Sequence, residues 1–441
     1  MTVASLCNDI LVLAVFLLVG FFVRELCKPL QKLFLPSSLI GGLILLLLGQ
    51  QILGVVEVPE SFGSIPSVMI DIVMAATVFG VTINRKKLGS YLDYSCMTMT
   101  SYGMQLGLGV LLGWLLQKIW PGLPDGWGVM GVFSFHGGHG TAAAAGAAFE
   151  KLGIEGNMAV GMVLSTLGLI VAMLVGMIMV NFGIRRGWGT YVKEPKKQPD
   201  YFYGGVLPEE KRVASGHTVT TGISINHLAL QVAWLLTALF IGRKLFGFLG
   251  AYIPFFNELP SVLHGIFGGA ILWQFLKATK LERYVDLKTI KMASGFCLEI
   301  TVFTAMATLD MEFVSTYIVP VLIYTVILAV LTVPIIFYLA YRFCREEWFE
   351  KACMAFGAAT GNTSTGLALV RAVDPDSLSS AGDPHGVYSA IMSWKDVFVG
   401  LTPIWLTSGI GLTCGVGFAM MFGFAAFGFI FFARKNKRTA A

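Results

Sequence analysis

Charged residues are scarce in this sequence: only 13% of its 441 residues are Asp, Glu, Lys or Arg, whereas 56% are hydrophobic. With a mean hydropathy of +0.74, the chain is too apolar for an ordinary soluble protein, in which about a quarter of the residues are charged. Its seven cysteines are scattered, and no CxxC or zinc-type spacing occurs. The composition therefore excludes a soluble enzyme, a secreted disulfide scaffold or a nucleic-acid binder as a description of the whole chain.

The apolar residues occur in blocks of about twenty, the length that crosses a bilayer as a helix. The first block has no positively charged region before it and no small-residue cleavage site after it, so we expect a transmembrane helix rather than a signal peptide. The sequence predicts an all-α polytopic membrane protein without a cofactor. The expected spans are 8–26, 37–55, 67–84, 96–117, 158–181, 227–249, 260–276, 289–309, 316–341, 386–410 and 413–433.

Two further stretches, 127–149 and 349–372, are weakly apolar and dominated by Gly, Ala, Ser and Thr. If both are re-entrant and the N-terminus is outside, 26 of the 31 Lys and Arg residues fall inside and four fall outside, with Lys395 within a span. If both stretches crossed instead, the basic loops would move outside, against the positive-inside rule. The charge bias therefore predicts two re-entrant hairpins, an outer N-terminus and a cytoplasmic C-terminus.

The chain also contains an internal repeat, with residues 1–181 and 227–410 on either side of a polar linker, 182–226. Five spans separate equivalent helices, and because five is odd we expect two inverted repeats of five transmembrane helices, each with a hairpin. Residues 411–441 would add an extra C-terminal helix and a basic tail. The matching segments are 17–26 with 235–245, 35–42 with 259–269, and 69–84 with 297–312, which pairs Asp71 with Glu299; the two hairpins match as well.

Inverted repeats with broken, Gly-rich segments in corresponding positions are typical of secondary transporters. Irregular backbone at membrane depth survives only where it is buried in protein or lines a wet cavity. Two hairpins that enter from opposite faces would bring their tips together near the midplane. Their half-helix N-termini could hold an anion there, while free carbonyl groups could hold a cation.

The loop GGHGT at 137–141 is similar to the first re-entrant loop of the bacterial sodium:glutamate symporter family. The resemblance covers roughly residues 8–410 and implies a dimeric, sodium-driven symporter of glutamate-like dicarboxylates in the cell inner (cytoplasmic) membrane, with a mobile core and a fixed scaffold. The sequence departs from the family in three places: the second hairpin is rich in Asn, Thr and Ser, an eleventh span (413–433) is present, and Lys395 stands where the family pattern is apolar. The other similar segments are LPSSLIGG (35–42), LSTLGL (164–169), GNTSTG (361–366) and SWKDVF (393–398).

The polar residues of the two hairpins are the candidate substrate ligands. Carboxylate or sodium contacts and capping of the half-helices are both compatible with these residue types. A transition-metal site at His136 and His139 is not expected, because no Cys or carboxylate of the same loop completes a tetrahedral set. The substrate candidates are Gly137, Gly138, His139, Gly140, Thr141, Asn362, Thr363, Ser364 and Thr365.

Ionisable groups inside the spans are the candidate cation ligands, because burying a charge in a bilayer is costly. The resemblance places Asp396 and, in LSTLGL, Thr166 at a cation site. Glu299 and Asp71 follow, with an ion pair that only fixes helix packing as the alternative. Lys395 would border the same cavity as Asp396 and could replace one coupling cation, pair with Glu299 or Asp71, or contact a substrate carboxylate.

The leading hypothesis is therefore sodium-coupled symport of glutamate or a similar dicarboxylic amino acid, and not an enzyme. A 2-hydroxycarboxylate or other organic-anion carrier and a channel or cation/proton antiporter, with the carboxylates as proton sites, remain alternatives. An intramembrane enzyme is a third, and its only candidate histidines lie in the Gly-rich hairpin. The expected partners are an anionic small molecule, sodium (or protons), the lipid bilayer and a second copy in a homodimer, with no nucleic acid.

Overall fold

The computed structural model describes residues 3–33, 35–80, 91–192, 206, 208–212, 214, 216–221, 223–253, 256, 261–374 and 378–433. Throughout these residues the regular structure is helical. The basic tail, Arg85–Lys87 and most of the linker lie outside them. The helices are α1 (Val3–Leu26), α2 (Lys28–Lys32), α3 (Ser37–Leu48), α4 (Ile65–Thr77), α6 (Leu92–Ile119), α7 (Met130–Lys151), α8 (Asn157–Arg185), α10 (His227–Tyr252), α11 (Ser261–Ala278), α12 (Leu287–Ala307), α13 (Met311–Phe343), α14 (Trp348–Thr360), α15 (Thr363–Val373), α16 (Gly382–Ile391), α17 (Phe398–Thr407) and α18 (Gly411–Phe431), with 3₁₀ turns η1 (Glu60–Gly63), η2 (Trp127–Val129), η3 (Glu209–Lys211), η5 (Leu281–Tyr284) and η6 (Ser393–Val397).

Seven of the described helices are long and apolar enough to cross a bilayer, which confirms a polytopic helical membrane protein. They are α1, α6, α8, α10, α12, the greater part of α13, and α18. The predicted span 37–55 is shorter than expected, because α3 ends at Leu48 and Gly49 adopts extended backbone. A hydropathy window does not detect this end, because apolar residues continue past it.

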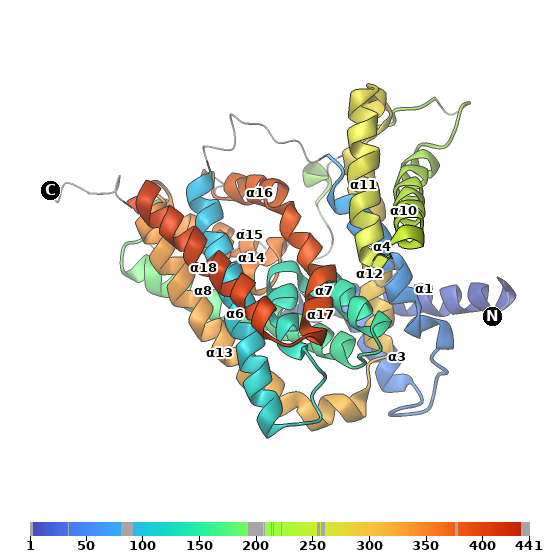
Figure 1. Cartoon of the computed structure of the whole chain (residues 1–441), viewed down its shortest axis with the longest axis horizontal. Coiled ribbons are helices and arrows are strands. Elements are labelled where there is room, and N and C mark those ends of the chain that lie inside the picture. The colour runs from blue at the N-terminus through green and yellow to red at the C-terminus, as the bar shows by residue number, and fades with distance from the viewer. Residues whose placement is uncertain are drawn as a thin grey trace.

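The predicted span 386–410 is not one helix, and this part of the prediction is wrong. It consists of α16, the 3₁₀ turn η6 and α17, with Lys395 and Asp396 in the turn. The apolar flanks masked the break, because the average over twenty residues remains hydrophobic across four polar positions. The two charged residues therefore lie at a bend between short helices (Figure 1).

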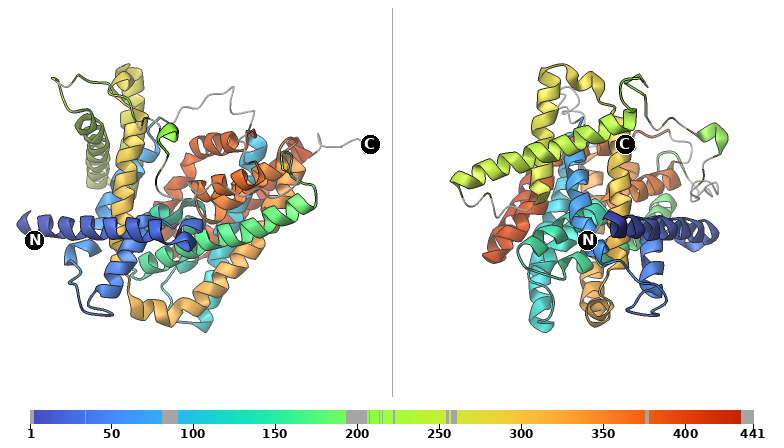
Figure 2. Two further views of the ribbon diagram at one scale, coloured as in Figure 1. Left: turned by 180° about the vertical axis from the view of Figure 1, so that it is seen from behind. Right: turned by 90° about the vertical axis from the view of Figure 1, so that its right-hand side faces the viewer.

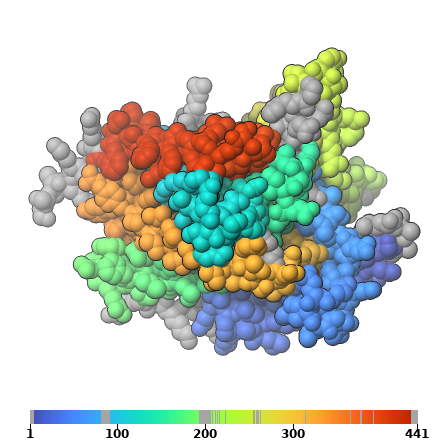
Figure 3. Space-filling model, turned by 60° about the horizontal axis from the view of Figure 1, so that its bottom comes forward, coloured from blue at the N-terminus to red at the C-terminus, as the bar shows by residue number. Residues whose placement is uncertain are grey.

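The extra helix α18 packs closely along α6 (Figure 1). A Cβ added at Gly107 would lie 3.1 Å from the backbone nitrogen of Phe418, and one at Gly417 would lie 2.6 Å from the Cα of Gly107. Small residues permit such backbone contact, as is usual between helices in membranes. Figure 3 shows the C-terminal helices, α6 and α13 side by side on one face of the molecule.

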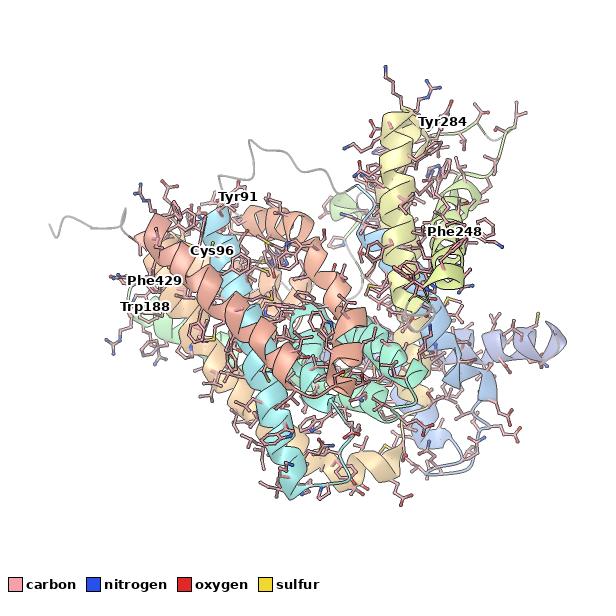
Figure 4. The ribbon with its side chains drawn as sticks, in the orientation of Figure 1. Tyr91, Cys96, Trp188, Phe248, Tyr284 and Phe429 are labelled. Atoms are coloured by element: carbon pink, nitrogen blue, oxygen red, sulfur yellow. The ribbon has the colours of Figure 1, made fainter. Side chains whose placement is uncertain are left out.

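A second group of helices, α10 and α11, stands to one side of this body (Figures 1 and 2). It has a hydrophobic core of its own with α4 and α12, in which Leu235, Trp273 and Ile290 are buried. Figure 4 shows Phe248 on α10 and Tyr284 beyond the end of α11, far from Phe429 on α18. The chain is therefore divided into a peripheral group of helices and a larger central body.

The two halves of the chain make corresponding helix contacts. α1 packs on α3 as α10 packs on α11, while α3 packs on α12 as α11 packs on α4. Glycines make the second pair of contacts possible: a Cβ at Gly42 would lie 2.5 Å from the carbonyl oxygen of Phe303, and one at Gly269 would lie 2.6 Å from that of Ala75. Gly42 and Gly269 end the matched segments of the internal repeat, so sequence similarity and packing agree at these positions.

Two glutamates at the start of α14 fasten the segment that follows α8. Glu350 accepts hydrogen bonds from the backbone nitrogen of Thr190 (2.7 Å) and its hydroxyl (3.2 Å). Glu347 accepts one from the hydroxyl of Tyr191 and two from Ser380, through its nitrogen (3.0 Å) and hydroxyl (2.8 Å). The same segment lines a cavity of about 950 Å³, and Trp188, labelled in Figure 4, is one of its lining residues.

Glu347→Gln is expected to lower the free energy of unfolding by about 1–2 kcal/mol, since these hydrogen bonds go to a charged acceptor. Partial burial acts to raise the pKa of Glu347, but the hydrogen bonds from Tyr191 and Ser380 outweigh it and hold the pKa below its ordinary value of 4.5. The stabilisation is thus complete above about pH 4.5 and is lost as the pH falls through the folded-state pKa.

Thermal unfolding between pH 3 and 7 measures this contribution. The wild type should lose stability on acidification more steeply than Glu347→Gln does. Glu346→Gln is the matched control, because Glu346 is a neighbouring carboxylate that is exposed. Equal pH profiles for the two variants would contradict this role of Glu347.

Candidate functional site at two helix breaks

The helix α7 is interrupted at Gly138, whose backbone angles are φ 64° and ψ −157°. The hydroxyl of Thr141 donates a hydrogen bond of 2.5 Å to the carbonyl oxygen of Phe133, eight residues earlier. Eight residues of continuous helix would separate these groups by about 12 Å. The chain therefore folds back at Gly138, and residues 130–151 form a helical hairpin, called hairpin 1 below.

The helices α14 and α15 form hairpin 2, residues 348–373, which turns at Gly361 and Asn362. Asn362 caps α15 by accepting a hydrogen bond from the nitrogen of Thr365 (2.9 Å), while the hydroxyl of Thr365 accepts one from the nitrogen of Asn362 (3.0 Å). The arms pack backbone to backbone, because a Cβ at Gly357 would lie 2.6 Å from the Cα of Gly366. The predicted capping role of Asn362 and Thr365 is thus present.

In each hairpin, a threonine hydroxyl joins the two arms through a hydrogen bond. The hydroxyl of Thr365 donates to the carbonyl oxygen of Gly357 at 2.8 Å, again eight residues earlier. Thr141 and Thr365 therefore occupy equivalent positions, each three residues after a break at Gly138 or Asn362 and each bonded across to the opposite arm. Each threonine thus joins the two arms of its hairpin beside the break.

The tips of the hairpins meet. A Cβ placed on Gly138 would lie 3.3 Å from the carbonyl oxygen of Gly361 and 3.9 Å from the Cβ of Asn362. α8 passes both tips: a Cβ on Gly168 would lie 3.2 Å from the ring of Phe135 in hairpin 1, and one on Gly361 would lie 3.0 Å from the Cβ of Ala172. The hairpins lie at the centre of the molecule (Figure 1).

His139 leaves the tip of hairpin 1 toward α8, where its Nε2 lies 3.1 Å from the hydroxyl of Thr166. That hydroxyl donates its proton to the carbonyl oxygen of Met162 at 3.0 Å, so the histidine is the donor to Thr166. His139 is 7% exposed. The structure thus brings together the predicted His139 and Thr166, and the bond fixes the position of the tip relative to α8.

On the other side of the tips lies a polar cluster, formed by Tyr94, Tyr102, His136, His385, Tyr388, Lys395 and Asp396. His385 bridges two elements, because its Nδ1 lies 3.1 Å from the hydroxyl of Tyr94 and its Nε2 lies 3.3 Å from the hydroxyl of Thr363 in hairpin 2. The ring of His136 packs edge-on against Tyr102 at 5.2 Å. Both hairpins therefore border the cluster.

Lys395 and Asp396 form an ion pair, with the ammonium 3.1 Å from Oδ1 of Asp396. The side chains are only 15% and 18% exposed. In the same cluster, the hydroxyl of Tyr388 and the Nε2 of His136 are buried without a hydrogen-bond partner among the described residues. Buried polar atoms of this kind are uncommon in folded proteins and are a feature of sites that take up a ligand.

The comparison with known families decides the assignment. The model of the sodium/glutamate symporter family matches residues 3–374, which include both hairpins and α8. The chain belongs to the sodium/glutamate symporter family. No curated protein matches the chain. In this member of the family the matched residues end before α16, so Lys395 and Asp396 lie beyond them.

Two predicted cation ligands of this family member, Asp71 and Glu299, lie on α4 and α12, outside the two hairpins. Asp71 on α4 is 1% exposed and pairs with Arg243 of α10 at 3.4 Å. Its repeat mate Glu299 is exposed on α12. The geometry of Asp71 therefore matches the alternative to a cation ligand, which is an ion pair that fixes the packing of two helices. A role for either residue in cation binding stays a prediction.

The other predicted residues surround the junction. Gly137 and Thr363 are exposed beside it, whereas Gly138, His139, Gly140 and Thr365 are buried. Gly140 faces α12, where a Cβ would lie 3.0 Å from Leu298. The side chain of Ser364 lies outside the described part of the structure. Access to the tips is therefore from the side of Gly137 and Thr363.

Sequence reasoning missed several polar residues of this family member around the tips. Gln105 on α6 is fully buried and donates hydrogen bonds of 3.0 Å to Thr332 of α13 and to the carbonyl oxygen of Ala359 next to tip 2. A glutamine in an apolar span was a usable signal. Tyr94, Tyr102 and Tyr388 gave no such signal, because aromatic residues recur throughout the spans, and His385 lies just before the predicted span 386–410.

Proposed function

We propose that this protein is a secondary active transporter that couples the uptake of glutamate, or of a similar dicarboxylic amino acid, to sodium. The observation that carries the proposal is the contact between the two helix breaks, Gly138 against Gly361 and Asn362, in a chain of the sodium/glutamate symporter family. Two broken helices that meet inside a membrane protein are the usual construction of a binding site for an ion and its co-transported substrate.

The chemistry of the tips suits an anionic substrate. The second arm of each hairpin begins at the junction, so the unbonded N–H groups of two helix N-termini point toward it. The hydroxyl of Thr363 and the imidazole of His385 lie beside the start of α15. Substrate carboxylates would bind these donors, while carbonyl groups released at Gly138 and Gly361 would accept sodium. Thr166, whose hydroxyl contacts His139 of hairpin 1, would be a further oxygen ligand, while Asp396 is paired with Lys395.

The helix arrangement suits alternating access. We propose that the corresponding contacts of the two halves reflect inverted repeats and that the hairpins are re-entrant, entering from opposite faces. α10 and α11, with their separate core on α4 and α12, would then be part of a fixed scaffold in a homodimer. The hairpins, α6 and α13 would move as the transporting core. The protein would work in the cytoplasmic membrane.

Uptake of labelled glutamate into proteoliposomes tests the proposal. An inward sodium gradient should drive concentrative uptake that a potassium gradient does not support, and unlabelled glutamate should compete. Uptake of a 2-hydroxycarboxylate in place of glutamate would favour the organic-anion carrier. Uptake of sodium against a proton gradient without any dicarboxylate would favour the cation/proton antiporter. Absence of uptake with every dicarboxylate tested would remove the proposed function.

The topology can be tested separately, with one cysteine added at a time to a Cys7→Ser/Cys27→Ser background, in which the five remaining native thiols are buried. Glu57 and Ser224 are both exposed. The charge distribution predicts that Glu57→Cys reacts with an impermeant maleimide in intact cells, while Ser224→Cys in the linker reacts only after permeabilisation. Labelling of Ser224→Cys from outside would reverse the predicted membrane topology and would remove the charge argument for re-entrant hairpins.

A further inference from the structure

The ammonium of Lys395 is enclosed by three groups that each attract a cation. Oδ1 of Asp396 lies 3.1 Å away. The ring centroids of Tyr102 and Tyr388 each lie 5.8 Å from the Nζ atom. Aromatic faces attract a positive charge at such distances, and a carboxylate completes the arrangement. We call Asp396, Tyr102 and Tyr388 the cation cage.

The cage is assembled from elements far apart in sequence. Tyr102 belongs to α6, Tyr388 to α16, and Asp396 to the 3₁₀ turn η6. Both tyrosines are 3% exposed. His136, two residues before the break in hairpin 1, packs against Tyr102, and His385 bonded to Thr363 of hairpin 2 packs against Tyr388 at 5.9 Å. The cage thus contacts residues of both hairpins.

A site with one carboxylate and two aromatic faces has a net charge of −1 and is suited to a monovalent cation. Here the chain fills it with its own ammonium, so that the region is electrically neutral without a bound ion. The pair lies in the short 3₁₀ turn η6, between α16 and α17.

We propose that the cation cage is a monovalent-cation site of the transport machinery and that Lys395 permanently occupies it, as a tethered replacement for one coupling ion. This inference rests on the proposed function, because it assigns a role in coupling. Its consequence is that the protein needs one external cation fewer than a chain with an empty cage. The hydroxyl of Tyr388 and Nε2 of His136, which have no hydrogen-bond partner in the described part of the chain, then remain available in the cluster around the cage.

The first experiment needs no transport. Purified wild type and Lys395→Ala are unfolded by heat in choline, methylammonium or sodium chloride at one ionic strength. Lys395→Ala should have a lower midpoint in choline, because Asp396 loses its partner, and should recover by several degrees in methylammonium, which fits the vacated space. The wild type should respond equally to choline and methylammonium. In Lys395→Ala/Asp396→Asn the recovery should disappear.

The second experiment measures glutamate uptake against sodium concentration. Lys395→Ala should require more sodium, with a Hill coefficient about one higher than that of the wild type. Lys395→Gln, which retains more of the packing, serves if the alanine variant does not fold, and it should also show a stronger sodium dependence. Arginine at this position keeps the charge, so Lys395→Arg should keep the sodium dependence of the wild type.

The proposal is overturned if methylammonium stabilises Lys395→Ala no more than it stabilises the wild type, or if the double variant recovers equally. It is also overturned if the neutral variants keep the wild-type sodium response and only bind glutamate more weakly, because the lysine would then be a substrate ligand. Absence of glutamate uptake by the wild type would remove the proposed function alone, since the unfolding experiment tests the cage without it.

Discussion

Gly138→Val is expected to reduce transport about 100-fold or more, although the protein should still insert and fold. Gly138 has φ 64°, a conformation that a β-branched residue adopts only under strain. The added Cβ would lie 3.3 Å from the carbonyl oxygen of Gly361, and the valine methyl groups would enter the space between the tips. Uptake into proteoliposomes, with membrane amounts checked by immunoblot, measures the effect.

Gly153→Val is a control that separates the effect of backbone strain from the effect of the contact between the hairpin tips. Gly153 has φ 74°, but a Cβ there meets no atom within 4 Å. This control should therefore lose some stability and keep most of its transport rate. If Gly138→Val transported as well as Gly153→Val, the contact between the tips would be packing without a role in transport.

Thr365→Val is expected to lower the free energy of unfolding by about 2 kcal/mol and to reduce uptake at least about tenfold. Valine has nearly the same shape but can neither donate to the carbonyl oxygen of Gly357 nor accept from the nitrogen of Asn362. Two buried backbone groups then lose a partner, and the turn of hairpin 2 is no longer fastened to the opposite arm. Thr141→Val should have the same effect on hairpin 1.

Thr360→Val is the matched control for this prediction. Thr360 is fully buried in the same hairpin, but its hydroxyl bonds the carbonyl oxygen of Phe356, four residues back in its own helix. Its loss should cost less than about 1 kcal/mol. Thermal unfolding and initial uptake rates compare the two variants, and an equal loss for both would show that the bond between the arms has no special role.

The sequence predicted the broken segments because their composition differs from that of the spans. Glycine, alanine and small hydroxylated residues at 127–149 and 349–372 are too polar for a lipid-facing helix, and the helical hairpins found at 130–151 and 348–373 nearly coincide with them. Local chemistry also indicated that Asn362 and Thr365 cap a helix. Whether these hairpins are re-entrant stays a prediction, because their orientation in a bilayer depends on the membrane.

The sequence could not predict which polar groups meet. Asp71 and Glu299 occupy matched positions in the repeat, yet one is buried against Arg243 and the other is exposed, because different helices cover them. The ion pair of Lys395 with Asp396 lies in a 3₁₀ turn that an average of hydropathy does not detect. The aromatic faces around Lys395 come from α6 and α16, and their meeting depends on tertiary packing alone.

The glycine contact between α18 and α6 has a practical consequence for observing motion. Backbones that touch at Gly107 and Gly417 cannot slide past each other without opening a void, so α18 must travel wherever α6 travels. Spin labels could therefore be placed at two exposed positions, Phe422 of α18 and Phe248 of α10. The distance between the labels would report movement of the central body relative to the peripheral helices, and neither label would lie in a hairpin.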